Sequence, residues 1–252
     1  MPEIPEEVTA SMMDKAARAR LRTLSKDNAE DVGRHLVMAG QDLDTDPELA
    51  YKYAQIALER GGRVDVVREA AAVTAYATGR FAEALREFRT VRRLSGTQEH
   101  LPLMADCERG LGRPERAIAM SQEPEAQLLG RYGKAEMQLV VAGARADLGE
   151  HEVALVVLES TTPVAEEQRV RIESTKADLL DVLGRSEEAA AIRAALPAED
   201  LEEEPDEEVV VFDVAELELD DDGERDADDE GEGGDILTDD VLTDDELNEM
   251  DE

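Results

Sequence analysis

Small apolar residues recur along this chain at a spacing close to 34 positions. Five alanines define the repeat, with separations of 34, 33, 37 and 35 residues. A glycine stands five residues before four of these alanines, and a small or apolar residue stands twelve residues before each. The alanines are Ala50, Ala84, Ala117, Ala154 and Ala189. The glycines are Gly79, Gly112, Gly149 and Gly184, and the earlier residues are Met38, Ala72, Ala105, Ala142 and Ala177.

This pattern predicts pairs of antiparallel helices. A glycine adopts the left-handed conformation that ends a helix more readily than any other residue. Small residues on both helices of a pair allow close approach. One such pair cannot bury its apolar face alone, so several pairs are expected to stack.

The periodicity places eleven helices. The first two have Ser11 and Ser25 as predicted caps, and the third begins at Pro47 after the capping residue Asp46. A longer connection or short extra turn over residues 123–133 accounts for the 37-residue spacing. The expected helices cover residues 11–24, 26–43, 47–60, 64–78, 80–94, 99–111, 114–121, 134–148, 151–159, 166–183 and 186–195.

The repeat resembles the tetratricopeptide repeat family over about residues 26–196. The segments Thr78–Phe88, Leu111–Ile118 and Gly149–Leu155 carry the likeness. The tryptophan that the family places early in its first helix is absent, and related two-helix repeats fit the same pattern. The resemblance implies an all-α solenoid of about five helical hairpins that binds other proteins.

A narrower resemblance links the chain to an uncharacterised actinobacterial family of repeat proteins. Residues 63–96 and 105–119 carry it. That family is associated with a neighbouring gene for a haloacid-dehalogenase-type phosphatase. The resemblance therefore suggests such a phosphatase as a partner; the oligomeric state is left open.

The chain is expected to have three parts, and charge sets the last of them apart. The formal net charge is -36, and residues 199–252 contribute -28 of it, with 29 Asp and Glu against the single Arg225. We expect an N-terminal segment with a capping helix over 1–25, a repeat domain over 26–198 and a disordered acidic tail over 199–252. Within that tail, residues 209–214 and the doublet 236–240/241–245 are more apolar and are candidates for a short binding motif.

Composition and motifs exclude several classes of function. The acidic balance argues against nucleic-acid binding. No signal peptide or membrane-length apolar run is expected, so the sequence predicts a cytoplasmic protein. No phosphate loop, catalytic or metal-ligand spacing is recognisable, which predicts a protein without enzymatic activity or cofactors. Cys107 is predicted to be a small packed residue.

Two surfaces are candidates for binding, and a solvated helix face is the alternative for each. The family resemblance implies that the first helix of each pair lines a groove, and the matching positions are His35, Asp42, Glu69, Tyr76, Asp106, Arg109, Asp147 and Asp178. Separately, Arg86, Arg89 and Arg93 share one helix face through three- and four-residue spacing. This Arg face lies in the densest basic segment, with Arg80 and Arg92, and suits an acidic partner or the acidic tail.

The sequence thus predicts a scaffold that binds a protein or peptide, with the tail modulating access. The alternative is an acidic chaperone or nucleic-acid mimic whose tail captures basic proteins.

Overall fold

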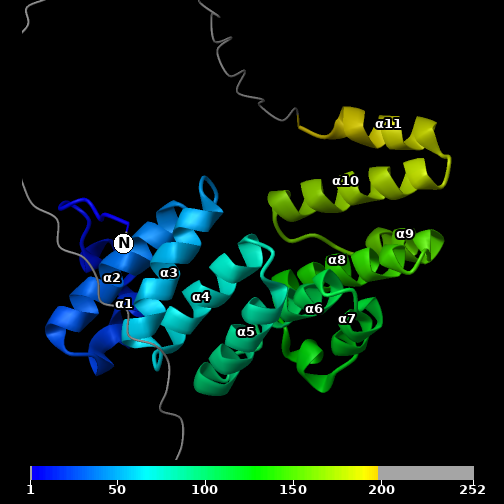
Figure 1. Cartoon of the computed structure of the whole chain (residues 1–252). Helices are drawn as coiled ribbons and strands as arrows, with labels where there is room; N and C mark the ends of the chain where they lie inside the picture. Colours follow the sequence, from blue (N-terminus) through cyan, green and yellow to red (C-terminus); the bar gives the residue numbers. More distant parts are fainter. Residues whose placement is uncertain (1, 198–252) are drawn as a thin grey trace, which may run out of the picture. The chain divides into compact units, whose positions relative to one another are not determined.

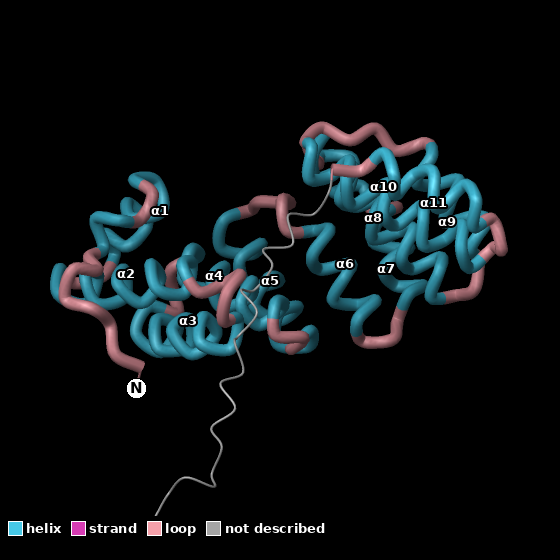
Figure 2. Tube along the Cα trace, turned by 90° about the horizontal axis from the view of Figure 1, so that it is seen from above, coloured by secondary structure: helices cyan, strands magenta, loops and turns pink. Residues whose placement is uncertain are grey.

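The computed structural model describes residues 2–197, and every regular element in this range is a helix (Figures 1 and 2). The expected all-α class is therefore confirmed for this part of the chain. Predictions for residues 199–252, including the disordered tail and its two apolar segments, lie outside the described residues. The α-helices are α1 (Lys15–Arg20), α2 (Lys26–Gln41), α3 (Pro47–Gly61), α4 (Asp65–Ala77), α5 (Phe81–Ser95), α6 (Leu101–Gly110), α7 (Pro114–Ser121), α8 (Arg131–Asp147), α9 (His151–Glu159), α10 (Glu166–Val182) and α11 (Ser186–Ala195).

Ten of these helices form five pairs of sequence neighbours. Extensive contacts lie within the pairs α2–α3, α4–α5, α6–α7, α8–α9 and α10–α11. Each pair also packs on the next, through α3–α4, α5–α6, α7–α8 and α9–α10, and α6 and α8 contact each other directly. Contacts therefore run mainly between neighbours along the chain, as expected for stacked hairpins.

The core consists of several local clusters, each built where helices of one or two neighbouring pairs meet. The five repeat alanines are all fully buried, which confirms the role that their spacing predicts. A methyl group at these positions lets two helices approach closely, and larger residues such as Phe88, Leu158 and Ile172 fill the space beside them.

The four repeat glycines end their helices in the left-handed conformation, with φ between 71° and 77°. At Gly149 the amide donates to the carbonyl of Ala146 (2.8 Å), and the next amide, of Glu150, donates to Arg145 (2.9 Å). These two bonds satisfy carbonyls that the end of α8 would otherwise leave free.

Two glycine substitutions should shift stability in opposite directions. Gly149→Ala should lower the free energy of unfolding by about 1 kcal/mol, because an alanine is strained at positive φ. Gly40→Ala should raise it by about 0.5 kcal/mol, because Gly40 lies in α2 with nothing within 4 Å of an added Cβ. Urea denaturation of both variants measures the difference. A loss of stability in Gly40→Ala, or none in Gly149→Ala, would contradict the structure at that position.

The N-terminal region differs from the prediction of one helix over 11–24. It contains a 3₁₀ turn (Ala10–Met12), α1, and a second 3₁₀ turn (Leu21–Thr23). Met13 is extended, and the carboxylate of Asp14 caps α1 by accepting from Ala16 (2.7 Å) and Ala17 (3.1 Å). The predicted cap Ser11 therefore lies inside the first turn and starts no long helix.

Of the other two predicted capping residues, one caps its helix and one does not. Asp46 caps α3 as expected, since its Oδ1 accepts from the amide of Leu49 (2.9 Å) and Pro47 is the first helical residue. Ser25 occupies the cap position of α2, but its side chain makes no capping bond. The long connection before α8 contains a 3₁₀ turn, Pro124–Leu128.

Candidate functional site

A surface hollow of about 860 Å³, which we call the groove, is lined by α4, α6, α8, α10 and the connection before α6. These are the first helices of four successive pairs (Figures 1 and 2). The groove has charged, hydroxyl and apolar residues along its walls.

The repeat register places equivalent residues of different helices in the groove. Glu99, Glu136 and Arg171 each stand six residues before the buried alanine of their pair, and all three line the groove. Residues three before those alanines, such as Leu139, line it too. At about 100° per residue, positions three and six before an alanine lie about 60° and 120° around the helix from it, on the same side. The face next to the buried alanines therefore forms the groove wall.

A polar network crosses one end of the groove and joins three helices. The hydroxyl of Tyr76 on α4 donates to Oδ2 of Asp106 on α6 (2.5 Å), and Nε of Arg109 donates to Oδ1 of the same carboxylate (2.7 Å). Nη1 of Arg109 reaches Asp147 on α8 (3.2 Å). Burial raises the pKa of Tyr76 well above its usual range, and the bond to Asp106 adds to the effect.

Gly143 on α8 lies beside this network. A Cβ built at Gly143 would lie 3.4 Å from Nε of Arg109, so the arginine lies directly against the helix backbone. This is an ordinary van der Waals distance, so an alanine would also fit at this position in the C-terminal half of α8.

A second polar group lies where α8 and α10 meet. Gln168 is fully buried, and its Nε2 donates to Glu136 (2.6 Å) and to the carbonyl of Tyr132 (3.1 Å). Arg171 forms an ion pair with the same Glu136 carboxylate. Both arginines of the groove are thus fixed by carboxylates before any ligand binds.

Apolar groups alternate with these charges. Tyr132 projects from the start of α8 with 53% of its surface exposed, and Leu139, Val140 and Val170 are partly buried beside it. Exposed aromatic surface next to fixed polar groups is typical of sites that bind peptides or small ligands.

The structure brings together three of the residues that the sequence predicts for binding. Tyr76, Asp106 and Arg109 line the groove and contact one another. Glu69 lies outside the groove lining, and its Oε1 is 2.9 Å from Nε2 of His100. Asp178 also lies outside it and binds Arg193 (2.8 Å). Tyr132, Glu136 and Arg171 also line the groove and are not among the residues predicted from the sequence, although the six-residue offset from the buried alanines identifies the last two.

The prediction that His35 faces a binding groove is wrong, because the side chain is only 2% exposed. The N-terminal segment covers this face of α2. Nε of Arg34 donates to the carbonyl of Val8 (2.8 Å), and the hydroxyl of Tyr53 donates to the carbonyl of Glu3 (2.7 Å). His35 lies beside the Tyr53 ring, edge-on at 6.2 Å.

The buried His35 should make stability depend on pH. Its Nδ1 donates to the carbonyl of Asp31 (2.8 Å), while Nε2 is buried without a partner, so protonating Nε2 is unfavourable. Burial lowers the pKa of His35, and the neighbouring Arg34 lowers it further; Asp31, 3.9 Å away, is the opposing carboxylate. The unfolded chain takes up this proton near pH 6.5 and the folded chain does not.

The free energy of unfolding should therefore be fully retained above about pH 6.5 and decrease as the pH falls below it. Urea titrations of the native chain and of His35→Phe between pH 5 and 7.5 measure how the free energy of unfolding depends on pH. The variant should lose part of the pH dependence, and an unchanged slope would contradict a neutral buried His35.

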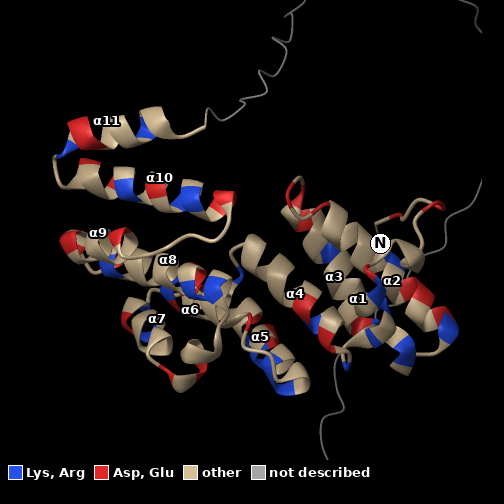
Figure 3. Ribbon diagram, turned by 180° about the vertical axis from the view of Figure 1, so that it is seen from behind, with Lys and Arg blue, Asp and Glu red and all other residues tan. Residues whose placement is uncertain are grey.

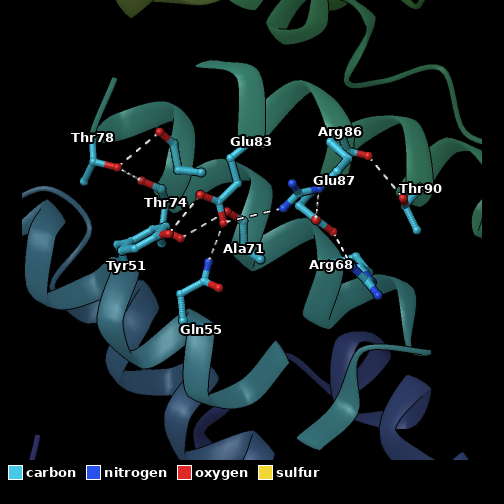
Figure 4. A network of polar contacts seen from close by, with 11 residues as sticks. Tyr51, Gln55, Arg68, Ala71, Thr74, Thr78, Glu83, Arg86, Glu87 and Thr90 are labelled. Atoms are coloured by element: carbon cyan, nitrogen blue, oxygen red, sulfur yellow. Dashed lines mark hydrogen bonds and ion pairs between the residues drawn. The ribbon is translucent and has the colours of Figure 1, made fainter. Parts of the chain in front are cut away.

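The Arg face is partly neutralised by buried carboxylates that the sequence analysis did not identify. Glu87, 2% exposed, binds Nη1 of Arg68 (2.5 Å) and Nε of Arg86 (3.0 Å), as Figure 4 shows. Glu108, 1% exposed, binds Arg89 (3.1 Å) and Arg113 (3.2 Å), with Arg116 at 3.6 Å.

These pairs fix the positions of Arg86 and Arg89, which stay 67% and 55% exposed. The third residue of the face, Arg93, is exposed and pairs with no carboxylate of residues 2–197. The face remains positively charged, but its first two members already hold acidic partners.

Cys107 is fully buried in α6, which confirms it as a packed residue. Burial raises the pKa of its thiol to about 12, and the neighbouring Asp106 and Glu108 add to the effect. The thiol is therefore protonated at neutral pH.

No family model, curated protein or solved structure matches the chain. Within residues 2–197, no helix has both the length and the apolar character needed to cross a membrane.

Proposed function

We propose that this chain is a non-enzymatic scaffold that binds a peptide segment of another protein in the groove. In this proposal the five helix pairs form a solenoid of tetratricopeptide type. The observation that carries it is the groove itself, in which four first helices present apolar side chains between polar groups already fixed by hydrogen bonds. Prearranged groups bind with less loss of conformational entropy.

The size and shape of the groove suit a short segment of an extended chain. Its volume of about 860 Å³ lies within the usual range of ligand sites, about 300–1,000 Å³. It extends over several helices, so side chains along a peptide would meet Tyr132, Leu139 and Arg109 in turn.

The charges of the groove favour a peptide with a basic residue beside apolar ones. Asp106 and Glu136 already neutralise Arg109 and Arg171. Glu99 adds an exposed carboxylate without an ion pair to residues 2–197. Its charge is available to a lysine or arginine of the ligand.

Selection from a displayed library of random peptides, with the full chain as target, tests this proposal. The selected peptides should combine apolar residues with Lys or Arg. Glu99→Arg should weaken their binding about tenfold by placing like charges together. Glu152→Arg, which reverses an exposed carboxylate on α9, is the matched control and should bind normally. Peptides that bind both variants equally would reject the groove as the site.

The alternative is a chaperone or mimic that captures basic proteins with residues 199–252. It rests on the composition of that segment, which lies outside the described residues. Deleting the segment separates the two: the scaffold should keep its groove ligands, whereas the mimic should lose its partners.

A further inference from the structure

A second hollow, of about 450 Å³, lies near the N-terminus and is separate from the groove. We call it the N-terminal hollow. It is formed by the first 3₁₀ turn, α1, the second 3₁₀ turn and the start of α2. Its lining residues are Ala10, Lys15, Arg18, Ala19, Leu21, Arg22, Leu24, Lys26, Ala29 and Glu30.

Four exposed cations surround the N-terminal hollow: Lys15, Arg18, Arg22 and Lys26. They follow one another at intervals of three or four residues, and Figure 3 shows the basic residues of α1 and the start of α2 in blue. None of the four forms an ion pair with any residue in the range 2–197. Arg20, which lies among them in sequence, does form one, with Asp65.

The lining itself contains little negative charge to balance these cations, although Asp14 and Asp27 stand next to Lys15 and Lys26 in the sequence. The one carboxylate in the lining belongs to Glu30, whose Oε1 accepts from the amide of Ala10 (2.9 Å) and so helps to hold the first turn in place. The N-terminal hollow therefore has an excess of positive charge, in contrast to the groove, where each arginine is paired.

The floor of the N-terminal hollow is apolar. Leu21 is 1% exposed at its base, Leu24 and Ala29 are partly buried, and Ala19 completes the wall. A ligand that fits this arrangement carries carboxylates together with small or branched apolar side chains.

We propose that the N-terminal hollow binds the acidic C-terminal segment of the same chain, centred on residues 236–245. That stretch repeats two apolar residues, a threonine and two aspartates, as Ile236–Asp240 and Val241–Asp245. Its apolar pairs match the floor, and its aspartates match the four cations. Residues 199–252 carry a charge of -28, so electrostatic attraction also favours this occupant over other segments of the chain.

The length of the connecting chain permits this binding. The segment 198–235 has 38 residues, and an extended chain of that length spans up to about 130 Å. Because both partners belong to one molecule, the tail is present at a high effective concentration, on the order of millimolar for flexible connections. The proposal does not depend on peptide binding in the groove.

The Arg face is a weaker match for the same segment. Arg86 and Arg89 already bind the buried carboxylates of Glu87 and Glu108. An aspartate of the tail would compete with these carboxylates for Arg86 and Arg89. At the N-terminal hollow it meets cations that form no ion pair with residues 2–197.

Carbodiimide cross-linking of the full chain tests the proposal, because it joins a lysine to a carboxylate in direct contact. The chain has five lysines: Lys15, Lys26, Lys52, Lys134 and Lys176. The first two line the N-terminal hollow, while Lys52 and Lys134 are exposed elsewhere and serve as internal references. Mass spectrometry should find Asp239, Asp240, Asp244 and Asp245 joined mainly to Lys15 and Lys26.

The double variant Arg18→Glu/Arg22→Glu keeps both lysines and reverses two neighbouring charges. It should reduce the yield of these cross-links about tenfold, as should 0.5 M salt, which screens exposed charges. Arg93→Glu, which reverses an exposed unpaired arginine on α5, is the control and should leave the yield unchanged. Circular dichroism verifies that each variant keeps its helices.

Three results would overturn the proposal. One is cross-linking of the tail to all exposed lysines alike, and another is a yield that the double variant does not change. The third is a yield that falls on dilution, or products that join two copies of the chain, because either would place the tail of one molecule on another.

Discussion

Replacing Phe88 by Ala should lower the free energy of unfolding by about 3–5 kcal/mol. The ring is fully buried, and it stacks on His100 with 5.3 Å between the ring centroids. It also belongs to the cluster that joins the second helix pair to the third, with Leu85 and Met104. The substitution removes this contact area and leaves a cavity that neighbouring helices cannot fill without moving.

Urea denaturation followed by circular dichroism measures this loss. Leu94→Ala is the matched control because Leu94 lies on the same helix and is 45% exposed. Its cost should stay below about 1 kcal/mol. Similar costs for the two variants would contradict the packing of α5 against α6.

Tyr132→Ala should weaken binding of a groove-selected peptide by about 30-fold, corresponding to about 2 kcal/mol. Tyrosines that combine apolar surface with a polar tip often dominate the energy of an interface. Because the side chain is 53% exposed in the free protein, its loss should change the stability of the fold by less than about 0.5 kcal/mol. Calorimetric titration with the peptide measures the change in affinity.

Two controls separate the role of the ring from other effects. Tyr132→Phe keeps the apolar surface and should recover most of the affinity. Leu128→Ala removes a side chain that is 74% exposed in the preceding 3₁₀ turn and outside the groove lining, and it should bind normally. A normal affinity for Tyr132→Ala would show that the peptide binds elsewhere.

Most of the helical arrangement could be predicted from the sequence because two kinds of residue mark it directly. The buried alanines show where helices meet, and glycines with positive φ show where four of the first helices end. Ten of the eleven predicted helices match observed α-helices, with ends that differ by up to three residues. The repeat is easy to recognise because each helix pair needs small residues at the same contact positions.

The N-terminal region could not be predicted in the same way, since it has no repeat. Residues 11–24 have the composition of a helix, but Asp14 competes as a cap and interrupts it after Met13. The segment before it then covers α2. His35 and Glu69 hold equivalent repeat positions, each three residues before Met38 or Ala72. His35 is nevertheless buried under the N-terminal segment, whereas Glu69 is partly exposed.

The groove was predicted in part. Tyr76, Asp106 and Arg109 are there because helix periodicity fixes the face next to the buried alanines, one or four residues after Ala72 or Ala105. The partners of each side chain depend on the neighbouring pair, and one spacing expands to 37 residues before α8. Periodicity alone does not show that Arg109 reaches Asp147, or that Glu87 and Glu108 are buried beneath the Arg face.

Hydroxyl-radical footprinting of the full chain, with and without a selected peptide, tests most directly whether the groove is the binding surface. The method reports how accessible each side chain is to solvent. Bound peptide should slow oxidation of Tyr132 and Leu139 and leave Val156, which is 61% exposed on α9, unchanged. Unchanged oxidation of Tyr132 together with protection of Val156 would contradict the account.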